Sequence, residues 1–132
     1  MDNKDKLIVF NCSMVLTILF WRILVFLKNG EISILRAITG LNIHHHTYGT
    51  IILTISLLLY LFYKQNSIIL SFLGFGVGSI FDGFFSRLFK SYTRAQEIST
   101  YNANFYNALI LIVIIILISI IFYLMNKYKR DS

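Results

Sequence analysis

The chain has 132 residues, of which 57% are hydrophobic and only 14% carry a charged side chain. The apolar residues form long runs, several of which reach the roughly 20 residues that a helix needs to cross a bilayer core, and this excludes an ordinary soluble domain. Twelve Lys and Arg residues contribute to a net charge of +6, but they are spread among the termini and the connections without a basic stripe, so a nucleic-acid partner is not indicated.

The first predicted span runs from about residue 7 to residue 27, behind a short head that carries Lys4 and Lys6. No small-residue cleavage site follows it, so we expect it to remain as a membrane helix. Arg22 interrupts the run near its far end, where it either snorkels to the headgroups or points inward at an acid. Cys12, the only cysteine, lies about 15 Å from Arg22 along the helix and is not expected to join a site at that end.

The connection over residues 28–43 begins with a turn signal, Asn29-Gly30, and continues with apolar residues at helical spacing. It predicts either a short helix lying in the membrane interface or a plain loop. The second span is expected from about residue 44 to residue 63, where tyrosines and Lys64 anchor its end. Only three residues separate it from the third span, so the two are expected to form an antiparallel hairpin.

The third span, expected from about residue 67 to residue 89, is rich in small residues. Gly74 and Gly78 lie one turn apart on a face that also carries Asp82, because steps of four residues return to the same side of a helix. We expect the second span to pack closely against this face. The same face is also a candidate surface for a homo-oligomer.

A fourth span, composed almost entirely of Ile and Leu, is expected from about residue 106 to residue 125, after a polar stretch over residues 90–105. The chain is therefore predicted to be a single all-α domain over residues 1–132, an integral membrane bundle of four transmembrane helices with short loops. Four spans place both termini on one side. A small excess of Lys and Arg there favours cytoplasmic termini in a multi-pass protein of the cell membrane.

This topology brings polar residues from all four spans to the membrane face opposite the termini. His44, His45 and Asp82 are the candidate metal ligands, because neutral imidazole and carboxylate are usual ligands of zinc and iron. Neighbouring helix positions point ~100° apart, so at most two of the three consecutive histidines can share one centre. The candidate ligand-binding residues at the same face are Arg22, His46, Tyr48, Arg87, Arg94, Glu97 and Asn107.

A second interpretation of the same residues involves no metal. Asp82 then forms an ion pair with Arg22 or Arg87 that neutralises both charges. The histidines are interfacial, hydrogen-bonded side chains in this interpretation, and Tyr48 is an interfacial tyrosine.

Two motifs occur in order between residues 36 and 108: Thr39-Gly40-Leu41-Asn42-Ile43-His44-His45-x-x-x-Gly49, and then Gly74-x-Gly76-x-Gly78-x-x-x-Asp82. This order resembles a group of small prokaryotic integral membrane proteins. In that group a His-x-His-His-x-x-x-Gly box opens one helix and a Gly-rich helix ends in Asp-Glu. The resemblance implies that His44, His45 and Asp82 belong to one site. It implies no reaction, because the group has no established activity to carry over.

Three positions depart from the pattern of that group. Asn42 stands where the first histidine of the box would be, and Gly83 stands where the Glu would follow the Asp. Asn107 stands where a later Asp would open the last helix. Each departure replaces an ionisable side chain by a neutral one, so a metal site in this chain would have fewer ligands.

Three functions are compatible with these residues. The first is a polar His/Asp/Arg site at one membrane face that binds a divalent metal ion, zinc or iron, or an anionic lipid headgroup. The second is a metal-dependent enzyme that acts on a lipid or another membrane substrate. The third is a structural or accessory membrane subunit with no site chemistry. The lipid bilayer is the partner common to all three.

Overall fold

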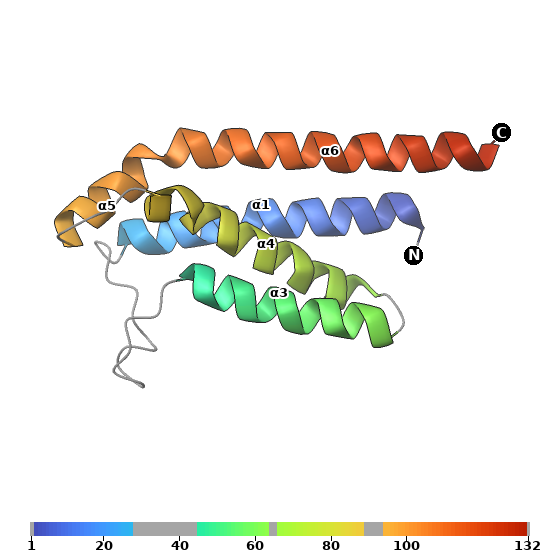
Figure 1. The fold of residues 1–132 in the computed structure, drawn as a ribbon, viewed down its shortest axis with the longest axis horizontal. Coiled ribbons are helices and arrows are strands. Elements are labelled where there is room, and N and C mark those ends of the chain that lie inside the picture. The colour runs from blue at the N-terminus through green and yellow to red at the C-terminus, as the bar shows by residue number, and fades with distance from the viewer. Residues whose placement is uncertain (1, 28–44, 64–65, 89–93, 132) are drawn as a thin grey trace.

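The computed structural model describes residues 2–27, 45–63, 66–88 and 94–131 of the chain. All regular structure within these residues is α-helical, which confirms the predicted all-α class. The N- and C-terminal ends lie at one end of the bundle (Figure 1). The described helices, in chain order, are α1 Asn3–Leu27, α3 His45–Phe62, α4 Ser67–Leu88, α5 Arg94–Ala103 and α6 Phe105–Asp131.

Three of these helices contain segments long and apolar enough to cross a membrane, namely Asn3–Leu27, Ser67–Phe84 and Phe105–Lys129. They correspond to the first, third and fourth expected spans, and they are the helices of a multi-pass membrane protein. The second expected span is a shorter apolar helix. With 18 residues, α3 measures about 27 Å, slightly less than a ~30 Å hydrocarbon core. The connection over residues 28–43, for which an interfacial helix or a loop was expected, lies outside the described residues.

Helix α4 lies at the centre of the bundle and packs against α1 and α3. The contact between α3 and α4 is the most extensive in the bundle, which confirms the expected pairing of the second and third spans. Gly49 and Gly76 lie in this interface. A Cβ atom on Gly49 would lie 2.6 Å from the Cβ of Ser79, and one on Gly76 would lie 2.8 Å from the Cβ of Leu53. Glycine at these two positions therefore permits the close approach of the two backbones.

The expectation that Gly74 and Gly78 face the second span is wrong, because both residues face α1. A Cβ atom on Gly74 would lie 2.5 Å from the carbonyl oxygen of Phe10, and one on Gly78 would lie 2.6 Å from that of Met14. Gly76 is two residues from each, which turns it about 200° around the helix axis and toward α3. The Gly74–Gly78 face is thus covered by α1 of the same chain, and a second copy could reach it only by displacing that helix.

Apolar side chains between the helices form two buried clusters. In the first, Met14 and Ile18 of α1 pack against Ile112 of α6. The second lies near the α3–α4 turn and consists of Ile69, Leu70 and Leu73, with Val9, Phe10, Leu53 and Tyr60 packed around them. Helix α4 thus shares apolar contacts with both neighbours.

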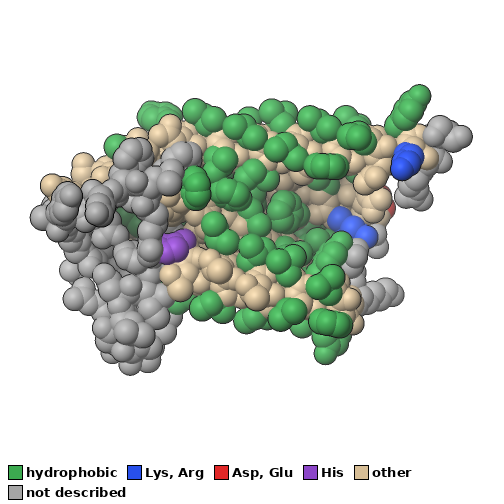
Figure 2. All heavy atoms as spheres, in the orientation of Figure 1, with side chains coloured by type: hydrophobic (Ala, Val, Ile, Leu, Met, Phe, Trp, Pro, Cys, Tyr) green, Lys and Arg blue, Asp and Glu red, His purple; other side chains and the backbone are tan. Residues whose placement is uncertain are grey.

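Helix α6 is the most exposed of the long helices and lies alongside α1 (Figure 1). It is joined to α1 by the Ile112 contact and by one polar pair, in which Nδ2 of Asn11 donates to Oγ of Ser119 at 3.0 Å. Between Asn107 and Asn126 its remaining surface is almost wholly apolar, and apolar side chains cover much of the bundle surface in Figure 2. Such a surface is suited to contact with lipid chains.

Helix α5 occupies part of the polar stretch that was expected to connect the third and fourth spans. It continues into α6 through a single turn residue, Asn104. The Nδ2 of Asn104 donates to the carbonyl oxygen of Thr100 at 2.8 Å, which satisfies one of the last carbonyls of α5. The break at Asn104 turns α5 toward the ends of α1 and α4 (Figure 1).

We predict that Gly78→Leu lowers the thermal stability of the detergent-solubilised protein strongly, because any side chain at residue 78 meets the backbone of α1. Overpacking of this kind costs about 1–3 kcal/mol or more. The control is Leu117→Ala, which removes an exposed side chain of α6 and should change the unfolding temperature little. Equal unfolding temperatures for Gly78→Leu and the wild type would contradict the close α1–α4 packing.

Candidate functional site

A buried ion pair joins α1 to α4 at the end of the bundle that carries α5. Asp82 of α4 is only 1% exposed. Nε of Arg22 in α1 donates to Oδ1 of Asp82 at 2.6 Å, and the side chain of Arg22 is 12% exposed. A charge with so little access to water requires a partner of opposite charge. Arg22, one of the two partners considered for Asp82, is thus in contact with it, whereas the side chain of Arg87 lies outside the described part of the chain.

Tyr101 of α5 completes this contact. Its phenolic OH donates to Oδ2 of Asp82. Its backbone carbonyl oxygen accepts a hydrogen bond from Nη1 of Arg22 at 2.7 Å, and its ring centroid lies 3.7 Å from the guanidinium carbon of Arg22. The aromatic face therefore also contributes a cation–π contact. These three residues are called the Arg22–Asp82–Tyr101 cluster below.

The phenol of Tyr101 acts as a hydrogen-bond donor in this cluster. Burial raises the pKa of Tyr101, and the neighbouring Asp82 carboxylate raises it further, while Arg22 acts in the opposite direction. The phenol therefore stays protonated across the physiological range. It can donate to Asp82 but is poorly suited to act as a base.

Sequence analysis missed Tyr101 as a member of the site. The sequence pattern that could have identified Tyr101 is a row of residues on one helix face, which continues from the polar stretch into the last span. Tyr101, Asn104, Ala108 and Ile112 are all buried, and they are separated by three, four and four residues. This spacing keeps them on one helix face despite the break at Asn104.

One turn below the cluster, three helices meet at the same level. Nε1 of Trp21 in α1 donates to Oγ of Ser79 in α4 at 2.8 Å, and Ser79 is fully buried. On its other side, Ser79 lies against Gly49 of α3. Because α3 and α4 are antiparallel, the backbone of His45, four residues before Gly49, lies about level with Asp82, three residues after Ser79. The histidine end of α3 is thus at the same end of the bundle as the cluster.

Several predicted site residues lie outside what the structure describes. His44 precedes the first described residue of α3. The backbones of four others lie in helices, but their side chains are outside the described part: His45, Arg87, Arg94 and Glu97. Their proposed roles stay predictions.

The side chains of the other three predicted residues are described. His46 is half-buried, and its Nε2 lies 3.3 Å from Oγ1 of Thr47, within hydrogen-bond distance. Tyr48 is half-buried in the first turn of α3. Asn107 is exposed, and its Nδ2 donates to Oδ1 of Asn104 at 2.8 Å, so it supports the α5–α6 junction.

The described side chains contain no group of three or more His, Cys, Asp or Glu residues that could hold a metal ion. Asp82, the only predicted metal ligand whose side chain is described, has a hydrogen-bond donor on each carboxylate oxygen. Cys12 is an exposed free thiol. Metal binding at this face stays a prediction, since the side chains of His44 and His45 lie outside the described part of the chain.

Comparison of the chain with protein-family models, with curated proteins and with solved structures finds no match. The resemblance to small membrane proteins with a histidine box therefore stays a prediction.

We predict that Tyr101→Phe lowers the unfolding temperature, because Oδ2 of the buried Asp82 loses its donor. A hydrogen bond to a charged group contributes about 1.5–3 kcal/mol. Tyr106→Phe is the matched control, since Tyr106 is 74% exposed. An equal effect of the two substitutions in detergent-solubilised protein would contradict the role assigned to Tyr101.

Proposed function

We propose that the protein is a structural or accessory membrane subunit that crosses the bilayer four times. In this proposal the Arg22–Asp82–Tyr101 cluster holds the helices together, and this role is called the clamp below. The observation that carries this proposal is the hydrogen bonding within the cluster. Both carboxylate oxygens of Asp82 accept hydrogen bonds from within the chain, and Arg22 donates from Nε and Nη1. The polar groups of the cluster thus serve to hold α1, α4 and α5 together.

The packing of α3 supports a fourth crossing of the membrane. Gly49 near the start of α3 lies against Ser79, and Tyr60 near its end packs on the cluster of Ile69, Leu70 and Leu73. Helix α3 therefore follows α4 over almost its whole length. If α4 crosses the hydrocarbon core, α3 lies at the same depth.

The exposed side chains of α3 are compatible with lipid. Large apolar residues are exposed along it, and its exposed hydroxyls bond to their own helix: Oγ1 of Thr50 donates to the carbonyl oxygen of His46 at 3.0 Å, and Oγ1 of Thr54 donates to that of Thr50 at 2.9 Å. Such bonds satisfy polar atoms without water. The exposed apolar residues of α3 include Ile51, Ile55, Leu57, Leu58, Leu61 and Phe62.

A second candidate function is the binding of a divalent metal ion or an anionic lipid headgroup at the histidine end of α3. The observation that favours it is the position of the His45 backbone along the bundle, which is about level with Asp82 in the neighbouring helix. A ligand there would use the imidazoles as donors or metal ligands, with Asp82 held close by. A metal-dependent reaction on a membrane substrate would require this second function.

Reporters fused to the two termini should both be found on the same side of the membrane, because four crossings return the chain to its starting side. The Lys and Arg excess at the termini predicts that this side is the cytoplasm. Glycosylation and cytoplasmic activity reporters measure this directly. Opposite sides for the two reporters would show that α3 does not cross.

A double-mutant cycle on thermal unfolding separates the clamp from the ligand site. The clamp predicts that Asp82→Asn and Arg22→Gln are strongly non-additive, whereas Asp82→Asn and His45→Ala are additive. Breaking a buried ion pair from one side costs about 3–5 kcal/mol.

The same variants are examined by metal analysis of the purified protein. Stoichiometric zinc or iron that is lost in both His45→Ala and Asp82→Asn, together with coupling between these two substitutions, would reject the clamp as the function of Asp82 and support the metal site.

A further inference from the structure

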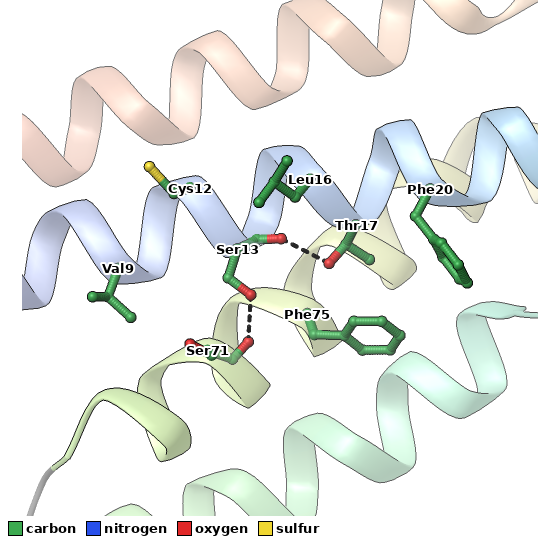
Figure 3. A pocket seen from close by; sticks show the side chains of 8 residues that line it. All are labelled: Val9, Cys12, Ser13, Leu16, Thr17, Phe20, Ser71 and Phe75. Atoms are coloured by element: carbon green, nitrogen blue, oxygen red, sulfur yellow. Dashed lines mark hydrogen bonds between the residues drawn. The ribbon is translucent and has the colours of Figure 1, made fainter.

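A groove runs along the outer side of the α1–α4 contact. Its volume is about 490 Å³. From α1 it is lined over three helical turns, between Val9 and Phe20, and α4 contributes Ser71 and Phe75 (Figure 3). Between these limits α1 also contributes Cys12, Ser13, Leu16 and Thr17. The α1 part of the lining extends for about 16 Å at ~1.5 Å per residue, parallel to the helix axis.

Two of the three hydroxyl side chains that line the groove are bonded to the backbone of the helices that form it. Oγ of Ser13 donates to the carbonyl oxygen of Ser71 at 2.6 Å, and Oγ1 of Thr17 donates to the carbonyl oxygen of Ser13 at 2.7 Å (Figure 3). The aromatic rings of Phe20 and Phe75 lie at one end of the groove (Figure 3). An occupant therefore meets mainly carbon.

We propose that this groove binds one acyl chain of a membrane lipid. The inference rests on α1 and α4 lying in the bilayer, and it goes beyond the clamp, which lies at the end of these helices. A groove of this length, parallel to a membrane-crossing helix and mainly apolar, has the direction and the chemistry of an extended hydrocarbon chain.

A partner helix fits the groove less well than an acyl chain does. Helices associate in membranes through small residues that allow close backbone approach and through polar side chains that bond across the interface. The two glycines of this part of α4, Gly74 and Gly78, are already in contact with α1. The hydroxyls of Ser13 and Thr17 are also in use.

The chain carries a native reporter beside the groove. Trp21 is its only tryptophan. The Trp21 ring centroid lies 5.2 Å from that of Phe20 and 6.2 Å from that of Phe75, and both phenylalanines line the groove. A heavy atom on a bound chain would therefore come close to the indole and quench its fluorescence.

The test is a titration of detergent-solubilised protein with phosphatidylcholine that has brominated acyl chains. We expect saturable quenching of Trp21 in the wild type. Ser71→Phe should remove most of this quenching, because the new ring fills the groove while the backbone carbonyl that accepts from Ser13 is kept. Cys12→Phe fills it from α1 and should act in the same way. The control, Ile68→Phe, changes an exposed residue of α4 that does not line the groove and should quench like the wild type.

Two results would overturn the proposal. Equal quenching in the wild type, Ser71→Phe and Cys12→Phe, with melting curves that show all three folded, would mean that only lipid around the whole protein is detected. A wild-type dimer that forms a Cys12–Cys12 crosslink and shows no quenching would mean that a second copy fills the groove. Failure of the protein to insert into vesicles would reject the membrane placement itself, which is a separate outcome.

Discussion

The carboxylate of Asp82 imposes the main constraint on this structure. It lies in a helix that otherwise has the composition of a membrane span, and it has almost no access to water. A charge in that position is tolerated only when cations and donors surround it. Arg22 supplies the cation from α1 and Tyr101 supplies the donor from α5, so the needs of one side chain bring three helices together. The position of α5 at the end of the bundle follows from this requirement.

Helix α4 packs closely against both α1 and α3 because it has glycine residues on each of the two faces that contact them. Gly74 and Gly78 admit α1, and Gly76 with Gly49 admits α3. Close approach increases dispersion contacts between backbones, which matter in lipid because the hydrophobic effect does not drive helices together there. The Trp21–Ser79 hydrogen bond lies in the same layer and adds a polar contact between α1 and α4. Below it, the Ile69, Leu70 and Leu73 cluster continues the contact to the turn between α3 and α4.

The positions of the helices could be predicted from the sequence because uninterrupted apolar runs must satisfy their backbone groups internally. The pairing of Arg22 with Asp82 was one of the alternatives that topology allowed, since both lie near the same end of their spans. The orientation of the Gly74–Gly78 face was predicted wrongly, because composition does not determine how a helix is rotated about its axis. Tyr101 was missed because it lies among polar residues, and the buried helix face to which it belongs becomes apolar only in α6. The histidine part of the site could not be compared with the structure, since most of it lies outside the described residues.

The polar pair between Asn11 and Ser119 affects how α6 is positioned against α1. Helix α6 is so uniformly rich in Ile and Leu that sliding it by one turn, or rotating it, would exchange one set of aliphatic contacts for a nearly equivalent set. Apolar contacts alone would then leave several arrangements of similar energy. The amide of Asn11 and the hydroxyl of Ser119 meet in only one of them. In the others the Asn11 amide would lose this partner in lipid, whereas the Ser119 hydroxyl also donates to the carbonyl oxygen of Ile116 in its own helix at 2.8 Å. Tyr101 holds the start of α6 through α5, and this hydrogen bond from Asn11 favours one arrangement along the apolar remainder of the helix, much as one buried asparagine sets the register of a coiled coil.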